Sequence, residues 1–220
     1  MLAVTVIAVV YALAALGVLL GAAYHKPWAK YYPWAKGAAS LGFLWVALSR
    51  ADGAGGYFWG LLACLVLCAA GDVLLGLANV HAGFFSRFFL AGAVCFTLAH
   101  AGFCLVFGLA AGWHPAELLL PVCLVGAAAA AARDKKRFRL KRMAAPALAY
   151  SFFVGLMCAQ SFVYALRTGA WLAAAGGALF LASDCVLLFL YFYYKKRRAF
   201  RALNLVTYYL GMLCLALAMG

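Results

Sequence analysis

The amino-acid sequence predicts an all-α, polytopic membrane protein, a bundle of eight transmembrane helices. Hydrophobic residues make up 70% of the 220 residues and the mean hydropathy is +1.02, which leaves too little polar surface to cover a globule in water. The apolar residues also gather into eight runs, each close to the roughly 20 residues that a helix needs to cross the hydrocarbon core. Together these two observations predict a membrane protein made of helices.

The eight predicted spans follow one another with short connections. In chain order they cover about 2–23, 31–49, 57–78, 88–111, 115–132, 146–166, 171–193 and 203–219. The first lacks a basic start and exceeds the length of a signal-peptide core, so it is interpreted as a helix of the bundle. Short connections predict antiparallel packing of consecutive helices. No linker or repeat divides the chain, so residues 1–220 are predicted to form a single domain.

Positive charge is concentrated in alternate loops. The net charge of +13 would suggest nucleic acid in a soluble protein, but here Lys and Arg stand between the apolar runs, so the predicted partner is the lipid bilayer and no nucleic acid. The loops after the odd-numbered spans hold 15 of these residues and the alternate loops hold 2. This contrast predicts cytoplasmic odd loops, external termini and location in a bacterial inner membrane. No motif predicts an oligomeric state.

A few ionisable residues stand inside the apolar runs. They are Lys36, Asp72, His100 and Asp184. A charge at the bilayer centre costs about 3 kcal/mol on insertion scales, so such residues are functional candidates. Counted from the inner ends of their spans, the depths of Asp72 and Asp184 differ by only about 5 Å. We therefore expect the two carboxylates to share a chamber in the inner half of the bilayer, with His100 slightly deeper.

An ordered set of short motifs accompanies these residues. It comprises Trp34-Ala35-Lys36, Gly71-Asp72-Val73-Leu74-Leu75, Phe89-x-x-Gly92-x-x-x-Phe96-x-x-Ala99-His100, Pro146-x-x-x-Tyr150 with Met157, Gly177-Ala178-Leu179-Phe180-x-x-Ser183-Asp184, and Tyr208-Tyr209-Leu210. Over about residues 30 to 215 the set resembles the YhhN-like membrane proteins, which include the lysoplasmalogenases. The chain departs from the family pattern at Gly37, Phe103 and Met212, where Pro, Tyr and Gln are common.

The resemblance implies a hydrolase that cleaves the vinyl-ether bond of a lysoplasmalogen. The products would be a fatty aldehyde and glycerophospho-ethanolamine or glycerophospho-choline, and the partner would be a lysophospholipid substrate. Such a reaction needs an acid that protonates the alkenyl carbon and a negative charge beside the resulting cation. Two carboxylates in different environments supply both, as they do in glycoside hydrolysis.

Roles can be assigned to the candidates on this basis. Asp184 is interpreted as the acid and Asp72 as the cation stabiliser or base, although the reverse order stays open. His100 is a candidate to position or deprotonate water, and Ser183 to hydrogen-bond the neighbouring carboxylate. The substrate-binding candidates are Lys36, Tyr150, Ser183 and Tyr208, with Lys36 placed near the headgroups to hold the phosphate. No cofactor and no metal are predicted.

Four other interpretations compete with this one. A proton-coupled transporter or channel would use the same Asp and His groups, but the chain has no inverted repeat. A hydrolase of lysolipid esters or amides is disfavoured because there is no Gly-x-Ser-x-Gly motif. A zinc site at Asp72, His100 and Asp184 would lack a second His. A purely structural membrane protein would tolerate Asn at both Asp positions without any change in lipid chemistry.

Overall fold

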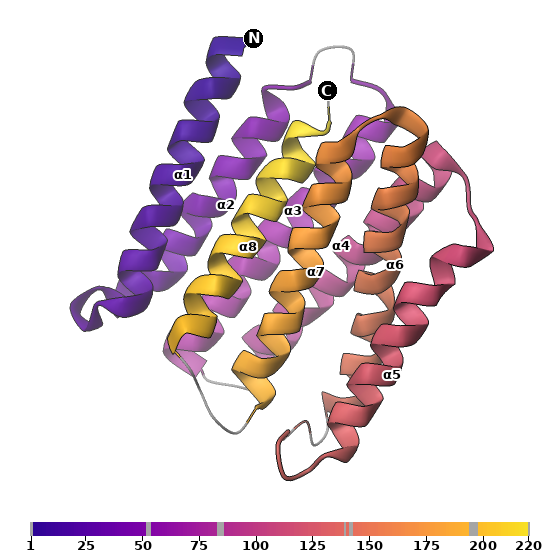
Figure 1. The fold of residues 1–220 in the computed structure, drawn as a ribbon. Coiled ribbons are helices and arrows are strands. Elements are labelled where there is room, and N and C mark those ends of the chain that lie inside the picture. Colours follow the sequence, from indigo (N-terminus) through magenta and orange to yellow (C-terminus); the bar gives the residue numbers. More distant parts are fainter. Residues whose placement is uncertain are drawn as a thin grey trace. The chain divides into compact units, whose positions relative to one another are not determined.

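The computed structural model describes residues 2–51, 54–82, 86–138, 140, 143–193 and 198–219. Eight long α-helices account for most of them (Figure 1). Their bounds are α1 Leu2–Tyr24, α2 Tyr32–Leu48, α3 Gly56–Leu77, α4 Arg87–Ala111, α5 Leu119–Arg133, α6 Ala144–Thr168, α7 Trp171–Phe192 and α8 Arg198–Leu217. Short helical turns cover Lys26–Tyr31, Ala78–Ala82 and Pro115–Leu118, and an isolated antiparallel bridge joins Phe138 to Tyr193. The all-helical prediction is confirmed for the described residues.

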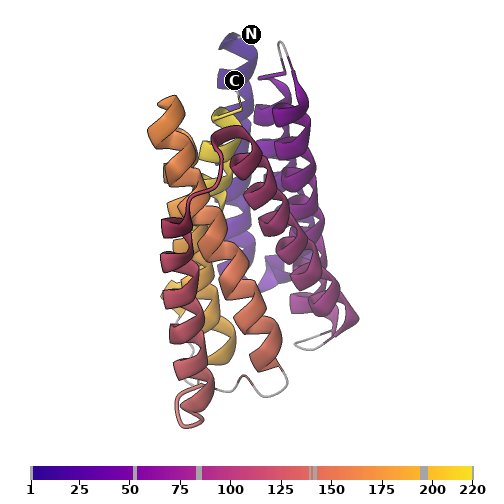
Figure 2. The ribbon, with the colours of Figure 1, turned by 90° about the vertical axis from the view of Figure 1, so that its right-hand side faces the viewer.

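The chain divides into two compact units. The first unit comprises Met1–Phe103 with Met212–Gly220, and the second comprises Cys104–Gly211, so the boundaries fall inside α4 and α8. Within the first unit α2 packs between α1 and α3, and the three helices alternate in direction (Figure 1). Within the second unit α6 packs against both α5 and α7, as the two ribbon views show (Figures 1 and 2). Short loops therefore produce antiparallel neighbours inside each unit, as the sequence predicted.

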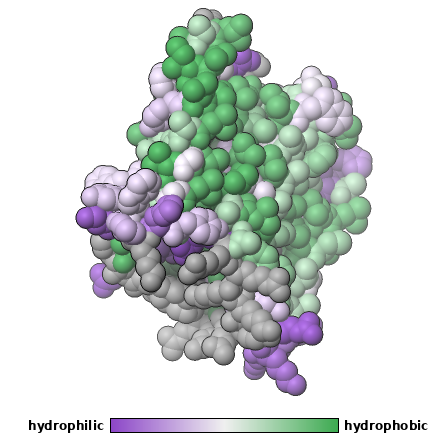
Figure 3. Space-filling model, turned by 60° about the vertical axis from the view of Figure 1, so that its left-hand side comes forward, coloured by the Kyte–Doolittle hydropathy of each residue, from purple (hydrophilic) through white to green (hydrophobic). Residues whose placement is uncertain are grey.

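Among the described residues, seven helices are long and apolar enough to cross a membrane. Apolar side chains such as Leu109 and Leu119 are 75% and 69% exposed, and much of the face in Figure 3 is apolar. Surfaces of this kind are stable against lipid and not against water. The protein is therefore an integral, multi-pass membrane protein.

The predicted span that does not meet these criteria is the second one, which corresponds to α2. It has 17 residues, which corresponds to about 26 Å and falls short of the roughly 30 Å hydrocarbon core. Buried Lys36 and Ser40 also make it the most polar part of the first unit's interior. The prediction of eight transmembrane helices is thus supported for seven of them.

Two predicted helix starts differ from the structure. The last helix begins at Arg198, five residues before the predicted start at 203, because its basic first turn extends the helix beyond the apolar run. The fifth apolar run begins with the 3-10 turn Pro115–Leu118, and the α-helix proper starts only at Leu119. Part of the predicted basic loops lies outside the described residues, namely Arg139, Lys141, Arg142, Lys195, Lys196 and Arg197.

Candidate active site

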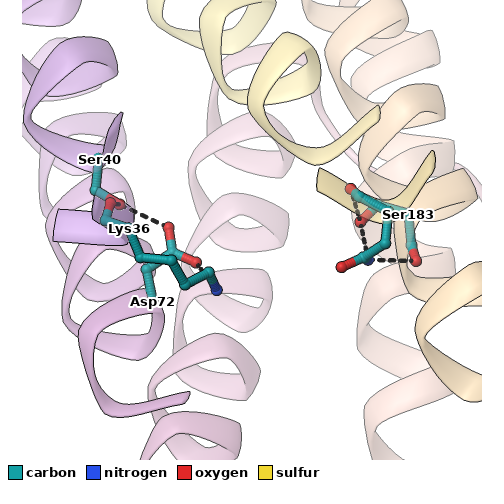
Figure 4. Close-up of polar contacts among 5 residues, drawn as sticks. Lys36, Ser40, Asp72 and Ser183 are labelled. Atoms are coloured by element: carbon teal, nitrogen blue, oxygen red, sulfur yellow. Dashed lines mark hydrogen bonds and ion pairs between the residues drawn. The ribbon is translucent and has the colours of Figure 1, made fainter. Parts of the chain in front are cut away.

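The candidate site residues of the first unit centre on Asp72. The Lys36 ammonium lies 2.7 Å from Asp72 Oδ1 as an ion pair, and the Ser40 hydroxyl donates to Asp72 Oδ2 at 2.7 Å (Figure 4). Asp72 is 0% exposed, Ser40 1% and Lys36 7%. Lys36 and Ser40 are four residues apart on α2, so both donors project from one face of that helix toward α3. The sequence did not single out Asp72 as the partner of Lys36, and the phosphate contact of Lys36 stays a prediction.

Glycines allow the neighbouring helices to approach Asp72 closely. A Cβ atom at Gly76 would lie 3.0 Å from the Cα atom of Pro33 on α2, and one at Gly71 would lie 2.8 Å from the Phe96 ring on α4. At Gly92 the same atom would lie 3.2 Å from the Gly71 carbonyl oxygen. Small residues at such contacts bring helix backbones together in membranes. The close packing of α2, α3 and α4 around Asp72 therefore has a direct steric basis.

The ion pair has large opposing energy terms. Desolvating two charges costs several kcal/mol for each ion, and only a short contact with additional hydrogen bonds offsets that cost. The 2.7 Å contact and the Ser40 hydroxyl provide both conditions. Because the pair is neutral as a whole, the interior of the first unit holds a carboxylate without a net charge in hydrocarbon.

His100 occupies the buried face of α4. Its side chain is 0% exposed, and Phe96 and Phe103, one turn away on either side, are 7% and 0% exposed. Phe96 also lies against Gly71, which precedes Asp72. Lys36, Asp72 and His100 are thus all buried in the interior of the first unit.

Asp184 stands in a different environment in the second unit. It is half-buried on α7, and the Tyr150 hydroxyl of α6 donates to its Oδ2 at 3.0 Å. The predicted sites Tyr150 and Asp184 are therefore direct partners. Asp184 is therefore paired with a neutral hydroxyl and is half-buried, whereas Asp72 is paired with a cation and fully buried.

Ser183 contacts α8 instead of its neighbour Asp184. Asn204 Nδ2 donates to the Ser183 carbonyl oxygen at 3.0 Å and to Ser183 Oγ at 2.8 Å. The Ser183 hydroxyl in turn donates to the Asn204 carbonyl oxygen at 3.2 Å. Figure 4 shows these contacts at Ser183. Tyr208, one turn after Asn204, is buried with its ring edge-on to Phe180 at a centroid distance of 5.2 Å. The sequence pointed to Ser183 and Tyr208 but not to Asn204.

Comparison with protein families decides the family of the chain. The family model described as "YhhN family" matches residues 31–219. The chain belongs to the YhhN family. Comparisons with curated proteins and with solved structures gave no match. Because the YhhN family is known as the lysoplasmalogenase family, membership suggests that this protein is a hydrolase.

The YhhN-family chain also buries a carboxylate that the sequence did not suggest. Glu117, 4% exposed, accepts a hydrogen bond from the His114 N–H at 3.0 Å and another from Gln160 Nε2, while Gln160 is 0% exposed. The His114 side chain in turn accepts from the Ala116 N–H, which completes a capping box. His114 and Glu117 are therefore local partners at this helix end. The signal was present, since Glu three residues after a capping residue is the usual pattern.

No metal centre is evident among the described residues of this YhhN-family protein. Nowhere in that part of the chain do three or more His, Cys, Asp or Glu side chains gather closely enough to hold an ion. Asp72 is engaged by Lys36 and Ser40, and Asp184 by Tyr150. The site residues thus form two polar clusters, defined here as the Asp72 cluster (Lys36, Ser40, Asp72) and the Asp184 cluster (Tyr150, Ser183, Asp184, Asn204).

Proposed function

We propose that this protein hydrolyses the vinyl-ether bond of lysoplasmalogens within the membrane. The observation that carries the proposal is the presence of two intramembrane carboxylates in unlike surroundings, one in a buried ion pair and one half-buried beside a hydroxyl. Membership of the YhhN family supports the same reaction class. Vinyl-ether hydrolysis needs an acid and a nearby negative charge, and two unlike carboxyl groups can supply both.

The proposed reaction proceeds in three steps. A carboxylic acid transfers its proton to the β-carbon of the alkenyl chain, which converts the vinyl ether to an oxocarbenium ion. Water adds to the cationic carbon and loses a proton to a base, which gives a hemiacetal. The hemiacetal then collapses to a fatty aldehyde and the glycerol hydroxyl of glycerophospho-ethanolamine or glycerophospho-choline. One water molecule is consumed and the acid is regenerated.

The surroundings of each carboxylate support one order of roles. Asp184 is partly accessible and is held by a neutral hydroxyl, so we assign it the proton transfer. Asp72 already carries its charge in an ion pair, so we assign it the stabilisation of the oxocarbenium ion. His100 would position or deprotonate the water, and Tyr150 would orient Asp184. The predicted contacts of Lys36, Ser183 and Tyr208 with the substrate stay proposals.

The test is aldehyde release from a lysoplasmalogen by purified protein in vesicles. Asp184→Asn should lower kcat about a thousandfold, within the range for loss of a general acid, and Asp72→Asn at least about a hundredfold. Asp134→Asn is the matched control, because Asp134 is a loop residue paired with Arg137 outside the helices. A lysophosphatidylcholine ester should give no product with any variant.

Two results would contradict the proposal. Folded wild-type protein that releases no aldehyde from any lysoplasmalogen would exclude the reaction. Unchanged turnover in both Asp→Asn variants would remove the carboxylates from it.

The runner-up function is proton-coupled transport, which the buried Lys36–Asp72 pair favours because such pairs also serve as proton relays. It predicts proton flux across vesicles that Asp72→Asn abolishes, with no lipid product at all.

A further inference from the structure

Helix α7 has two distinct contact faces. Toward α8 it presents Gly176, Phe180 and Ser183, and toward α6 it presents Gly177 and Asp184. On the α8 side, a Cβ atom at Gly211 would lie 3.1 Å from both the Gly176 carbonyl oxygen and the Phe180 nitrogen. On the α6 side, Ser161 occupies the space beside Gly177, and Tyr150 bonds Asp184. The helix is therefore held between two neighbours by adjacent stripes of residues.

The two stripes are one residue apart in the sequence. Residues 176, 180 and 183 repeat at the spacing of one helix face, and residues 177 and 184 follow at the next position, about 100° around the axis. The rotation of α7 about its own axis, as fixed by its contact with α8, therefore sets the direction in which Asp184 points. A small rotation of α7 about its own axis would carry the carboxylate away from the Tyr150 hydroxyl.

We propose that Asn204 is a positioning residue that fixes the rotation of α7 and so directs Asp184 toward Tyr150. The inference rests on the proposed function, in which Asp184 transfers the proton. None of the described hydrogen bonds joins Asn204 to Asp184 itself. It acts through Ser183, the residue that immediately precedes Asp184, by donating to both its carbonyl oxygen and its hydroxyl.

The other contacts between α7 and α8 cannot set the rotation as closely. The Gly211 contact is a close approach of backbones, and the Phe180–Tyr208 contact at 5.2 Å is an edge-to-face packing of rings. Asn204 and Ser183 instead exchange three hydrogen bonds of 2.8 to 3.2 Å, and hydrogen bonds weaken steeply when their angles change. The contact also lies next to Asp184 along α7, so a rotation of α7 at this contact changes the direction of the Asp184 side chain directly.

The first experiment measures aldehyde release with Asn204→Ala, Ser183→Ala and Thr207→Val. Thr207 is the matched control, because its hydroxyl bonds only to carbonyl oxygens of its own helix. Asn204→Ala should lower kcat about tenfold with KM unchanged, since small misplacements of a reacting group cost one to two orders of magnitude. Ser183→Ala, which retains the bond from Asn204 to the Ser183 carbonyl oxygen, should lie between Asn204→Ala and wild type, and Thr207→Val should match wild type.

A double-mutant cycle separates positioning from general destabilisation. If Asn204 acts through the Tyr150–Asp184 contact, Asn204→Ala should cost less than about twofold in kcat in a Tyr150→Phe background. An undiminished tenfold loss in that background would overturn the proposal, as would a wild-type kcat for Asn204→Ala itself.

A second measurement does not depend on catalysis. A hydrophobic carbodiimide labels membrane carboxyl groups, and mass spectrometry gives the labelling rate of Asp184. Tyr150→Phe and Asn204→Ala should each raise this rate about fivefold, as for the loss of one hydrogen bond, with no further rise in the double variant. Thr207→Val should leave it unchanged. If wild type releases no aldehyde, the proposed function fails while this measurement still decides the role of Asn204; unchanged labelling in Asn204→Ala would refute that role.

Discussion

The Asp72 cluster and the Asp184 cluster hold the same residue type in apolar helices by opposite means. Asp72 is completely buried and is neutralised by a cation, with glycines bringing α2, α3 and α4 close around it. Asp184 is half-buried and accepts a hydrogen bond from the Tyr150 hydroxyl of α6, while its neighbour Ser183 bonds to Asn204 of α8. The first arrangement makes a carboxylate inseparable from the stability of its unit. The second holds a half-buried carboxylate by a hydrogen bond from a neutral hydroxyl, which suits the proton transfer that we propose for it.

The largest effect on stability is expected from breaking the ion pair of the Asp72 cluster. Lys36→Met removes the cation and leaves a buried carboxylate, which should lower the free energy of unfolding by about 3 kcal/mol. The double variant Lys36→Met/Asp72→Leu replaces both charges by apolar groups and should recover to within about 1 kcal/mol of wild type. Ser40 keeps a partner in that variant, because its hydroxyl also lies 2.9 Å from the Lys36 carbonyl oxygen.

Thermal unfolding in detergent checks both values. A single variant as stable as wild type, or a double variant as unstable as the single one, would show that the pair does not hold the first unit together. Asp184→Asn is the comparison from the second unit. The described partner of Asp184 is the neutral Tyr150 hydroxyl, so the variant is expected to change stability by less than about 1 kcal/mol.

The sequence predicts the elements of the fold well, because hydrophobic runs of membrane length leave few alternatives to helices. Seven of the eight predicted spans are helices that are long and apolar enough to cross a membrane. The starts of α5 and α8 are predicted less accurately. The 3-10 turn at Pro115 belongs to the same apolar run as the helix that follows it, and the basic first turn at Arg198 is too polar to count as part of an apolar run. Composition locates helices, and local turn chemistry sets their ends.

The partners of the site residues were harder to predict than their positions. Lys36 and Asp72 are 36 residues apart, and their contact depends on how α2 and α3 align, which hydropathy does not encode. Lys36 was therefore assigned to a phosphate near the headgroups, although its ammonium lies on Asp72. Asn204 escaped notice because a single amide at the start of an apolar run has no distinguishing pattern. Its importance follows only from its contact with Ser183.

The second prediction concerns the glycine contacts that close the Asp72 cluster. Gly76→Ala would place a Cβ atom 3.0 Å from the Pro33 backbone, which cannot move independently of α2, so we expect a loss of about 2 kcal/mol from overpacking. Gly37→Ala is the matched control at the same pair of helices, because its Cβ atom would lie 3.6 Å from Val73 in ordinary contact. That variant should be neutral or stabilising by about 0.5 kcal/mol, since Ala favours helix.

Unfolding temperatures of Gly76→Ala and Gly37→Ala in the same detergent test whether the close approach of α2 and α3 stabilises the first unit. Equal stabilities would mean that α2 and α3 tolerate separation, and the close approach would then have no role in holding Lys36 against Asp72.

The smallest expected effects compare single hydroxyls in the two clusters. The Ser40 hydroxyl lies 2.7 Å from Asp72 Oδ2 and 2.9 Å from the Lys36 carbonyl oxygen, but it has one proton, which the charged acceptor attracts more strongly. Ser40→Ala should therefore cost about 1.5 kcal/mol of stability, because no water replaces the bond in a fully buried cluster. Tyr150→Phe should cost less than about 0.5 kcal/mol, because water can reach half-buried Asp184.

The order of the two variants should be reversed for turnover, with the larger loss of kcat in Tyr150→Phe. Tyr150→Phe leaves Asp184 without the donor that orients it and should lower kcat about tenfold, whereas Ser40→Ala retains the Lys36–Asp72 pair and should lower kcat less than about threefold. Both variants are measured for unfolding in detergent and for aldehyde release from the same vesicles. If Ser40→Ala lowered kcat about tenfold, as Tyr150→Phe is expected to do, the hydroxyl of the Asp72 cluster would matter as much for turnover as the hydroxyl of the Asp184 cluster. The proposed contrast between an ion-paired carboxylate that stabilises the cation and a carboxylate that transfers the proton would then fail.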